Sequence, residues 1–244
     1  MAATLRSSLL SEASAVRELA RLLDDPLYRN AGVPHADGRP ALVLPGLFGN
    51  DWYLWPMRAW LGRAGFRPLR STLVFNAGCP ERLRRRVDRQ LLQRARTVAG
   101  PVILIGHSRG GILARAIAGR LQEKVSHLIL LGSPVDLLSR TPGWSRTAVV
   151  QALGATGVAE ADIRVQALLD PHCDVPACGC PFPADFRRPL SERTRVVSIY
   201  SRDDPIVPAW TTPIPGAENV EVAGTHAGLV YNREVYRTLA RVLT

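Results

Sequence analysis

The chain has 244 residues, of which 46% are hydrophobic and 21% are charged. This composition is typical of a globular protein, and the length fits one sizeable domain, residues 1–244. No run of 18 apolar residues and no signal-peptide core is present, so we expect a cytosolic protein without a membrane-spanning helix.

The formal net charge is +10, and 30 of the 31 basic residues are arginine. The densest arginine run, 81–96, predicts an amphipathic helix with Leu83, Val87, Leu91 and Ala95 facing inward. Acidic residues dilute this run, and no aromatic residues interleave with its arginines as a stacking platform for bases requires. We therefore expect no nucleic-acid binding.

Along the chain, helical and strand patterns alternate. An N-terminal helix (5–24) leads through a turn-rich connector that ends at residue 40. The predicted strands are 41–45, 67–75, 102–106, 125–132, 194–200 and 219–224. The predicted helices between and after them are 52–65, 81–96, 111–124 and 231–243. The strands are continuously apolar, which is typical of a parallel sheet that is covered on both faces.

These patterns predict an α/β protein with a mostly parallel central sheet of about six strands and helices on both faces. Residues 133–193 contain no clear strand. They hold two helical patterns, 146–157 and 160–170, and a Pro- and Cys-rich loop. Because so long an excursion in a compact domain is usually functional, we expect a cap or lid over a site.

The sequence Gly106-His107-Ser108-Arg109-Gly110 lies between an apolar strand and a small-residue helical pattern. A serine on such a sharp strand-to-helix turn is held above the sheet edge, and glycines two residues away on either side remove backbone clashes. This context predicts that Ser108 is a nucleophile, with His107 pointing away from it.

A serine nucleophile needs a base, and the base needs an acid that orients it. His226 follows the last strand in a glycine-flanked loop, whereas His127 lies in an apolar strand and is typical of a core histidine. Asp203 and Asp204 both follow the strand 194–200. We favour Asp204 as the acid because an apolar segment follows it; Asp203 is the alternative.

An oxyanion site requires backbone N–H donors. The residue after the nucleophile, Arg109, supplies one in this arrangement, and the loop after the first core strand supplies the other. In PGLFGND (45–51), we expect the N–H of Leu47 to be that donor.

Five segments together resemble the α/β-hydrolase superfamily, and most closely its compact bacterial lipase and esterase branch. They are VLPGLFGND, LIGHSRGG, LILLGSP, SIYSRDDPIVP and VAGTHAGLVYN, within residues 41–244. The resemblance implies ester hydrolysis through an acyl-enzyme, with Ser108, Asp204 and His226 as the triad. Two positions depart from the common pattern: Pro45-Gly46 replaces His-Gly, and Arg109 replaces a methionine or glutamine. The guanidinium of Arg109 favours anionic substrates if it faces the site.

Cys173, Cys178 and Cys180 cluster beside His172, while Cys79 stands alone. Their spacing matches no common zinc site, so we expect reduced thiols, with a Cys173–Cys178 disulfide or a metal as the alternatives.

The sequence therefore predicts a serine esterase that acts on small-molecule or lipid esters without a cofactor. We expect aromatic residues of the excursion and of the 52–65 segment to line the acyl pocket, although the same residues suit a hydrophobic core. These residues are Trp52, Tyr53, Trp144, Phe182 and Phe186. The alternatives are an acyltransferase or thioesterase with the same triad, or a non-catalytic binding protein.

Overall fold

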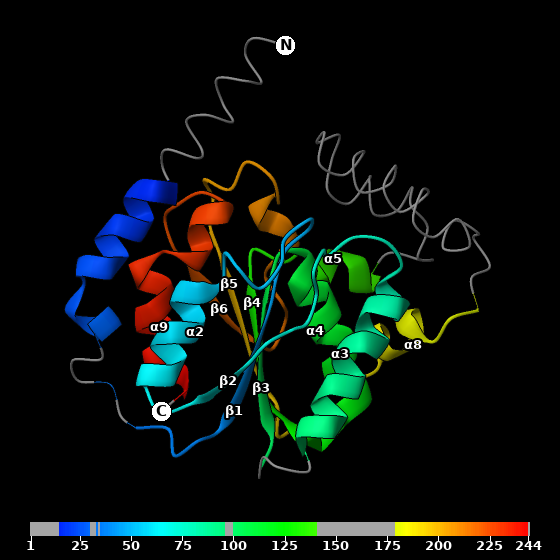
Figure 1. Cartoon of the computed structure of the whole chain (residues 1–244). Helices are drawn as coiled ribbons and strands as arrows, with labels where there is room; N and C mark the ends of the chain where they lie inside the picture. The colour runs from blue at the N-terminus through cyan, green and yellow to red at the C-terminus, as the bar shows by residue number, and fades with distance from the viewer. Residues whose placement is uncertain (1–14, 30–32, 34, 96–99, 141–178, 244) are drawn as a thin grey trace.

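The computed structural model describes residues 15–29, 33, 35–95, 100–140 and 179–243 (Figure 1). Its centre is a six-stranded sheet in the order β2-β1-β3-β4-β5-β6, with every neighbouring pair parallel. The strands are β1 (Pro40–Leu44), β2 (Arg67–Leu69), β3 (Val102–His107), β4 (Val125–Leu131), β5 (Arg195–Tyr200) and β6 (Glu218–Glu221). The predicted fold class, strand number and parallel direction are therefore confirmed.

Apolar residues cover both faces of this sheet, because successive side chains along a strand point to opposite faces. In β3, Ile103 and Ile105 belong to one hydrophobic core and Leu104 to the other. The same alternation runs through β1 and β4. The continuous apolar runs of the sequence thus reflect a sheet that is buried on both sides.

Helices form a layer over each face (Figure 1). Residues 15–24, α2 (Trp55–Arg63) and α9 (Arg233–Leu243) pack against one core. The second layer contains α3 (Pro80–Ala95), α4 (Arg109–Leu121), α5 (Val135–Arg140) and α8 (Phe182–Arg187). The described residues also form short 3₁₀ turns: η1 (Pro26–Arg29), η2 (Gln122–Lys124), η4 (Ala209–Thr211) and η5 (Ala227–Val230). In the described part of the chain, no helix is both long and apolar enough to cross a bilayer.

The strand β2 is much shorter than the predicted strand 67–75. The carboxylate of Asp51 accepts hydrogen bonds from the backbone N–H and the hydroxyl of Ser71, at 3.1 and 2.8 Å, and from the N–H of Thr72 at 3.3 Å. Thr72 also has a positive φ of 58°, so the chain turns away from the sheet there. The residues that follow β2 form a loop at the carboxyl edge.

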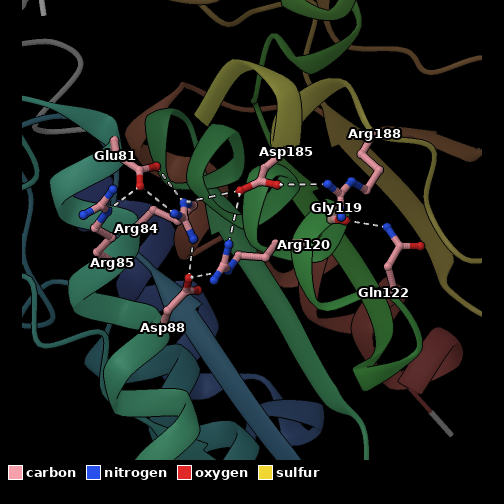
Figure 2. Close-up of polar contacts among 9 residues, drawn as sticks. All are labelled: Glu81, Arg84, Arg85, Asp88, Gly119, Arg120, Gln122, Asp185 and Arg188. Carbon is pink, nitrogen blue, oxygen red and sulfur yellow. Dashed lines mark hydrogen bonds and ion pairs between the residues drawn. The ribbon is translucent and has the colours of Figure 1, made fainter. Parts of the chain in front are cut away.

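Helix α3 has the predicted orientation: Leu83, Val87 and Leu91 are buried, while the side chain of Ala95 lies outside the described residues. Arg84, however, is buried as well, with a side chain 2% exposed. It pairs with Glu81 at 2.7 Å, with Asp88, and with Asp185 of α8 at 3.9 Å (Figure 2). Burial by itself lowers the pKa of Arg84, but the three carboxylates hold it above its ordinary value. This ion cluster connects α3 to α8.

Helix α8 also packs directly against α4. A Cβ on Gly119 of α4 would overlap the carbonyl oxygen of Asp185, so the contact depends on glycine. Of the predicted excursion 133–193, α5 and α8 lie within the described residues, and the predicted helices at 146–157 and 160–170 lie outside them. The end of the excursion is thus anchored to the rest of the domain through α3 and α4.

Candidate active site

Ser108 lies on a sharp turn between β3 and α4 and has φ 53° and ψ −124°. A non-glycine residue in such a conformation is strained by about 1–3 kcal/mol, and neighbouring contacts must hold it in place. The N–H of Ser108 donates to the carbonyl of Leu131 at 2.8 Å, and its carbonyl accepts from the N–H of Gly111 at 2.9 Å. The partly exposed serine therefore lies at the carboxyl edge of the sheet, where α4 begins.

The glycines around Ser108 allow backbones to approach each other. A Cβ on Gly110 would lie 2.5 Å from the carbonyl oxygen of Pro45, and one on Gly106 would overlap the start of α4. A Cβ on Gly46 would lie 3.3 Å from the Cβ of Ser108. The loop after β1 therefore touches the serine turn, as an oxyanion loop must.

Asp204 and His226 are joined by a hydrogen bond of 2.6 Å between Oδ2 and Nδ1. Both side chains are largely buried, at 1% and 12% exposed. The other oxygen of Asp204 accepts from the N–H groups of Ile206 at 2.8 Å and Val207 at 2.9 Å. Asp203 is exposed, so the carboxylate that contacts the histidine is that of Asp204.

The loops of Ser108, Asp204 and His226 meet around Gly132, a residue that the sequence interpretation missed. Gly132 directly follows the acceptor of the Ser108 N–H and has φ 53°. A Cβ there would lie 3.2 Å from Oδ2 of Asp204 and 3.3 Å from Nδ1 of His226. Ser108 and His226 both lie in the described part of the chain, and no hydrogen bond joins them there. Catalytic hydrogen bonds of this kind often form or shorten only when substrate binds.

His107 connects the loops on either side of the serine. Its Nε2 lies 2.9 Å from the carbonyl oxygen of His226, and its Nδ1 lies 3.0 Å from the hydroxyl of Tyr53. A carbonyl only accepts, so Nε2 carries the proton and Nδ1 accepts from Tyr53. The Tyr53 oxygen in turn accepts from the N–H of Gly46 at 2.5 Å. A continuous chain of hydrogen bonds thus joins the oxyanion-loop candidate to the loop of His226.

Burial, followed by the nearby His226, lowers the pKa of His107 from 6.5 to about 3. The His107 imidazole is therefore neutral at pH 7, as the hydrogen-bond chain requires. Burial likewise raises the pKa of Tyr53 and keeps its hydroxyl protonated. The GHSRG pattern alone contains no signal for these contacts, because both partners of His107 are far away in the sequence.

The loop of His226 also packs against the helix 15–24. The Glu18 carboxylate lies against Gly224 and Gly228, and a Cβ on Gly228 would overlap it. Burial raises the pKa of Glu18, although a backbone hydrogen bond from Thr225 and the charge of Arg21 oppose the rise. The helix thereby supports the loop from behind.

Segment 75–79 braces the loop after β1. The N–H of Phe48 donates to the carbonyl of Asn76 at 3.1 Å, and the Asn76 side chain donates to the carbonyl of Pro45 at 2.6 Å. The guanidinium of Arg109 donates to the carbonyl of Gly78 at 2.5 Å and is buried. The N–H of Leu47 has no acceptor among the described residues, which leaves it available to a ligand.

The predicted substrate-binding aromatics lie in different environments. Trp52 is 81% exposed, and Tyr53 is committed to Gly46 and His107. Phe182 and Phe186 are buried in the core beside α4, the role that the sequence left open as the alternative to pocket lining. Trp144 lies outside the described residues.

The cysteine cluster is only partly described. Cys79 is buried and Cys180 half-buried, and both are thiols rather than disulfide-bonded. Cys173, Cys178 and His172 lie outside the described residues, so the disulfide and metal alternatives stay predictions.

Comparisons with known proteins agree with this architecture. A family model described as "alpha/beta hydrolase fold" matches residues 65–169. No curated protein matches the chain. Among solved structures, the lipase BlEst2 from Bacillus licheniformis is 15% identical, with 88% of this chain and 95% of that chain covered and a TM-score of 0.60.

Two further structures are similar. The pyrethroid hydrolase PytH is 16% identical, with 84% of this chain and 98% of that chain covered and a TM-score of 0.54. The type II thioesterase BorB from the borrelidin biosynthetic cluster is 21% identical, with 86% and 93% covered and a TM-score of 0.53. At these identities the likeness concerns the fold. The parallel sheet and the matching family model together show that the chain has the α/β-hydrolase fold.

Proposed function

We propose that this protein hydrolyses carboxylic esters through an acyl-enzyme formed on Ser108. The observation that carries the proposal is the 2.6 Å hydrogen bond between Asp204 and His226, in loops that meet the Ser108 turn at Gly132. A buried carboxylate that holds Nδ1 of a histidine fixes the tautomer whose Nε2 can accept a proton. Such a pair next to a strained, partly exposed serine is the arrangement that activates a hydroxyl.

In the first half of the reaction, Ser108 Oγ attacks the ester carbonyl carbon and His226 Nε2 takes the hydroxyl proton. The carbonyl oxygen becomes an oxyanion, and the N–H groups of Leu47 and Arg109 are the donors assigned to it. One such donor is typically worth about 10²–10³ in rate. When the tetrahedral species collapses, the leaving alcohol departs with the proton from His226.

In the second half, water attacks the acyl-enzyme and gives a proton to His226. The Ser108–acyl bond then breaks, Oγ takes that proton back, and the carboxylic acid leaves. The charge of Asp204 stabilises the imidazolium in both halves. No cofactor takes part. Trp52 and the excursion 133–193 are our candidates for the acyl pocket, and a cytosolic location and activity on lipid esters stay predictions.

The test is p-nitrophenyl ester turnover by Ser108→Ala. We expect a loss of about 10⁶-fold with the fold intact, as for other serine triads. Ser139→Ala, at an exposed serine of α5, is the matched control and should retain wild-type turnover. Near-wild-type turnover by Ser108→Ala, or failure of a fluorophosphonate probe to label the wild-type protein, would overturn the proposal.

A further inference from the structure

A hollow of about 1000 Å³ lies beside α3, outside the site described above. We call it the arginine hollow, because six arginines line it: Arg82, Arg84, Arg85, Arg86, Arg89 and Arg120. Among the described residues, two carboxylates, Glu81 and Asp88, share the lining. Even with Asp185, which pairs with Arg84 and Arg120 from α8, the cations outnumber the anions.

Charged residues of the hollow differ in burial, and Figure 2 shows the ion pairs among the buried ones. The buried Glu81 and Asp88 are held by Arg84, and Arg120 lies 3.2 Å from Asp88. Arg86 and Arg89 are exposed on the same side of α3. The floor of the hollow is thus close to neutral and its rim is positive, which suits an anionic ligand.

Asp88 adds a second feature that points to a ligand. Its side chain is 10% exposed, and its Oδ1 is buried without a hydrogen-bond partner among the described residues. Burial raises the pKa of Asp88 despite the opposing charges of Arg84 and Arg120. Buried polar atoms nearly always have a hydrogen-bond partner. A ligand with an amino or hydroxyl group could donate the missing hydrogen bond to Oδ1 of Asp88.

The segment 75–79 contacts both one end of the hollow and the candidate active site. Phe75, Ala77 and Cys79 line the hollow. The residues between them contact the candidate site: Asn76 hydrogen-bonds to the loop after β1, and the carbonyl of Gly78 accepts from the side chain of Arg109.

We propose that the arginine hollow binds phosphate on the leaving half of the substrate, so that the preferred substrates are acyl thioesters of a phosphorylated thiol. The inference rests on the acyl-enzyme chemistry proposed for Ser108, with a thiol in place of the alcohol as the leaving group. Guanidinium groups recognise phosphate through paired hydrogen bonds. An acyl chain requires an apolar pocket, so a hollow lined by arginines takes the half that leaves. In the reaction, water and the thioester give the carboxylic acid and the thiol, whose sulfur takes its proton from His226.

The first test compares two thioesters of the same acyl chain, hexanoyl-coenzyme A and hexanoyl-N-acetylcysteamine. They contain the same scissile bond, and only the first carries phosphate. We expect kcat/KM to be higher for hexanoyl-coenzyme A by about tenfold or more. Added NaCl should reduce this advantage, because salt screens exposed charges.

The second test reverses the rim charges with Arg86→Glu/Arg89→Glu. Both side chains are exposed, so the fold should be unaffected. We expect KM for hexanoyl-coenzyme A to rise by about tenfold or more and that for hexanoyl-N-acetylcysteamine to stay within about twofold. Lys124→Glu/Arg193→Glu makes the same charge change at exposed positions near the amino ends of β4 and β5 and should alter neither value.

Equal kcat/KM for the two thioesters in the wild-type protein, or equal effects of the rim variant on both, would overturn the proposal. The proposed function is judged separately, by loss of hexanoyl-N-acetylcysteamine hydrolysis in Ser108→Ala. Calorimetry of coenzyme A binding to Ser108→Ala measures the affinity of the hollow without catalysis. We expect that binding to be lost when the rim variant is combined with Ser108→Ala, and unchanged binding would count against the hollow.

Discussion

Acidification should destabilise this protein through His107, and the size of the effect follows from its burial. The pKa of the folded-state imidazole is about 3, against 6.5 for an ordinary histidine. Between these values the unfolded chain binds a proton that the folded protein does not. The stability that the neutral imidazole contributes is therefore complete above pH 6.5 and is lost as the pH falls below it.

From pH 6.5 to pH 4.5 the expected loss is about 2–3 kcal/mol, because each pH unit in this window is worth about 1.4 kcal/mol. His107→Gln should remove this part of the pH dependence. The amide still offers a donor to the carbonyl of His226 and an acceptor to the hydroxyl of Tyr53, but it does not titrate in this range.

The assay is urea unfolding at half-unit intervals over that pH range for the wild type and for His107→Gln. The remaining titrating groups are common to both proteins, so the difference between the two curves isolates residue 107. His35→Gln, at an exposed histidine, is the control and should follow the wild type. Parallel curves for the wild type and His107→Gln would refute the reasoning.

Three further predictions concern single contacts. Asp204→Asn should lower kcat for p-nitrophenyl esters by about 10⁴-fold because the histidine tautomer is lost, whereas Asp203→Asn should stay near wild type; equal effects would contradict the assignment. Arg84→Ala should reduce the unfolding free energy by about 3–5 kcal/mol, since it removes the buried cation that three largely buried carboxylates share, and Arg85→Ala, at a side chain 65% exposed, should reduce it by less than about 1 kcal/mol in the same urea titration. Gly119→Ala should cost about 1–3 kcal/mol of thermal stability because its methyl group meets the backbone of α8, and an unchanged melting temperature would show that α8 can shift.

The fold was predictable from the sequence because its main signals are local. Continuous apolar runs identify strands that are buried on both faces, and the small residues after Ser108 identify the helix α4. The predicted strand 67–75 failed after residue 69 because Asp51, twenty residues earlier, binds the backbone and hydroxyl of Ser71. A local pattern carries no information on such a distant partner.

The candidate site shows the same division. The carboxyl ends of parallel strands meet at one edge of the sheet, so Asp204 and His226 could be placed near Ser108 from their positions in the chain. The hydrogen-bonding role of His107 could not be predicted in this way. It depends on Tyr53 and on the carbonyl of His226, which are 54 and 119 residues away in the sequence. Phe182 and Phe186 show a different limit, since an aromatic residue has the same sequence signal in a pocket as in a core.

The contact between Glu18 and the glycines at 224 and 228 has a practical consequence for handling the protein. Removing the helix 15–24 would remove the contacts that support the His226 loop. We therefore expect a shortened protein to keep its sheet and to lose the proposed ester hydrolysis. Loss of activity after proteolysis or tagging near this helix therefore says nothing about substrate preference until the helix itself has been shown to be intact.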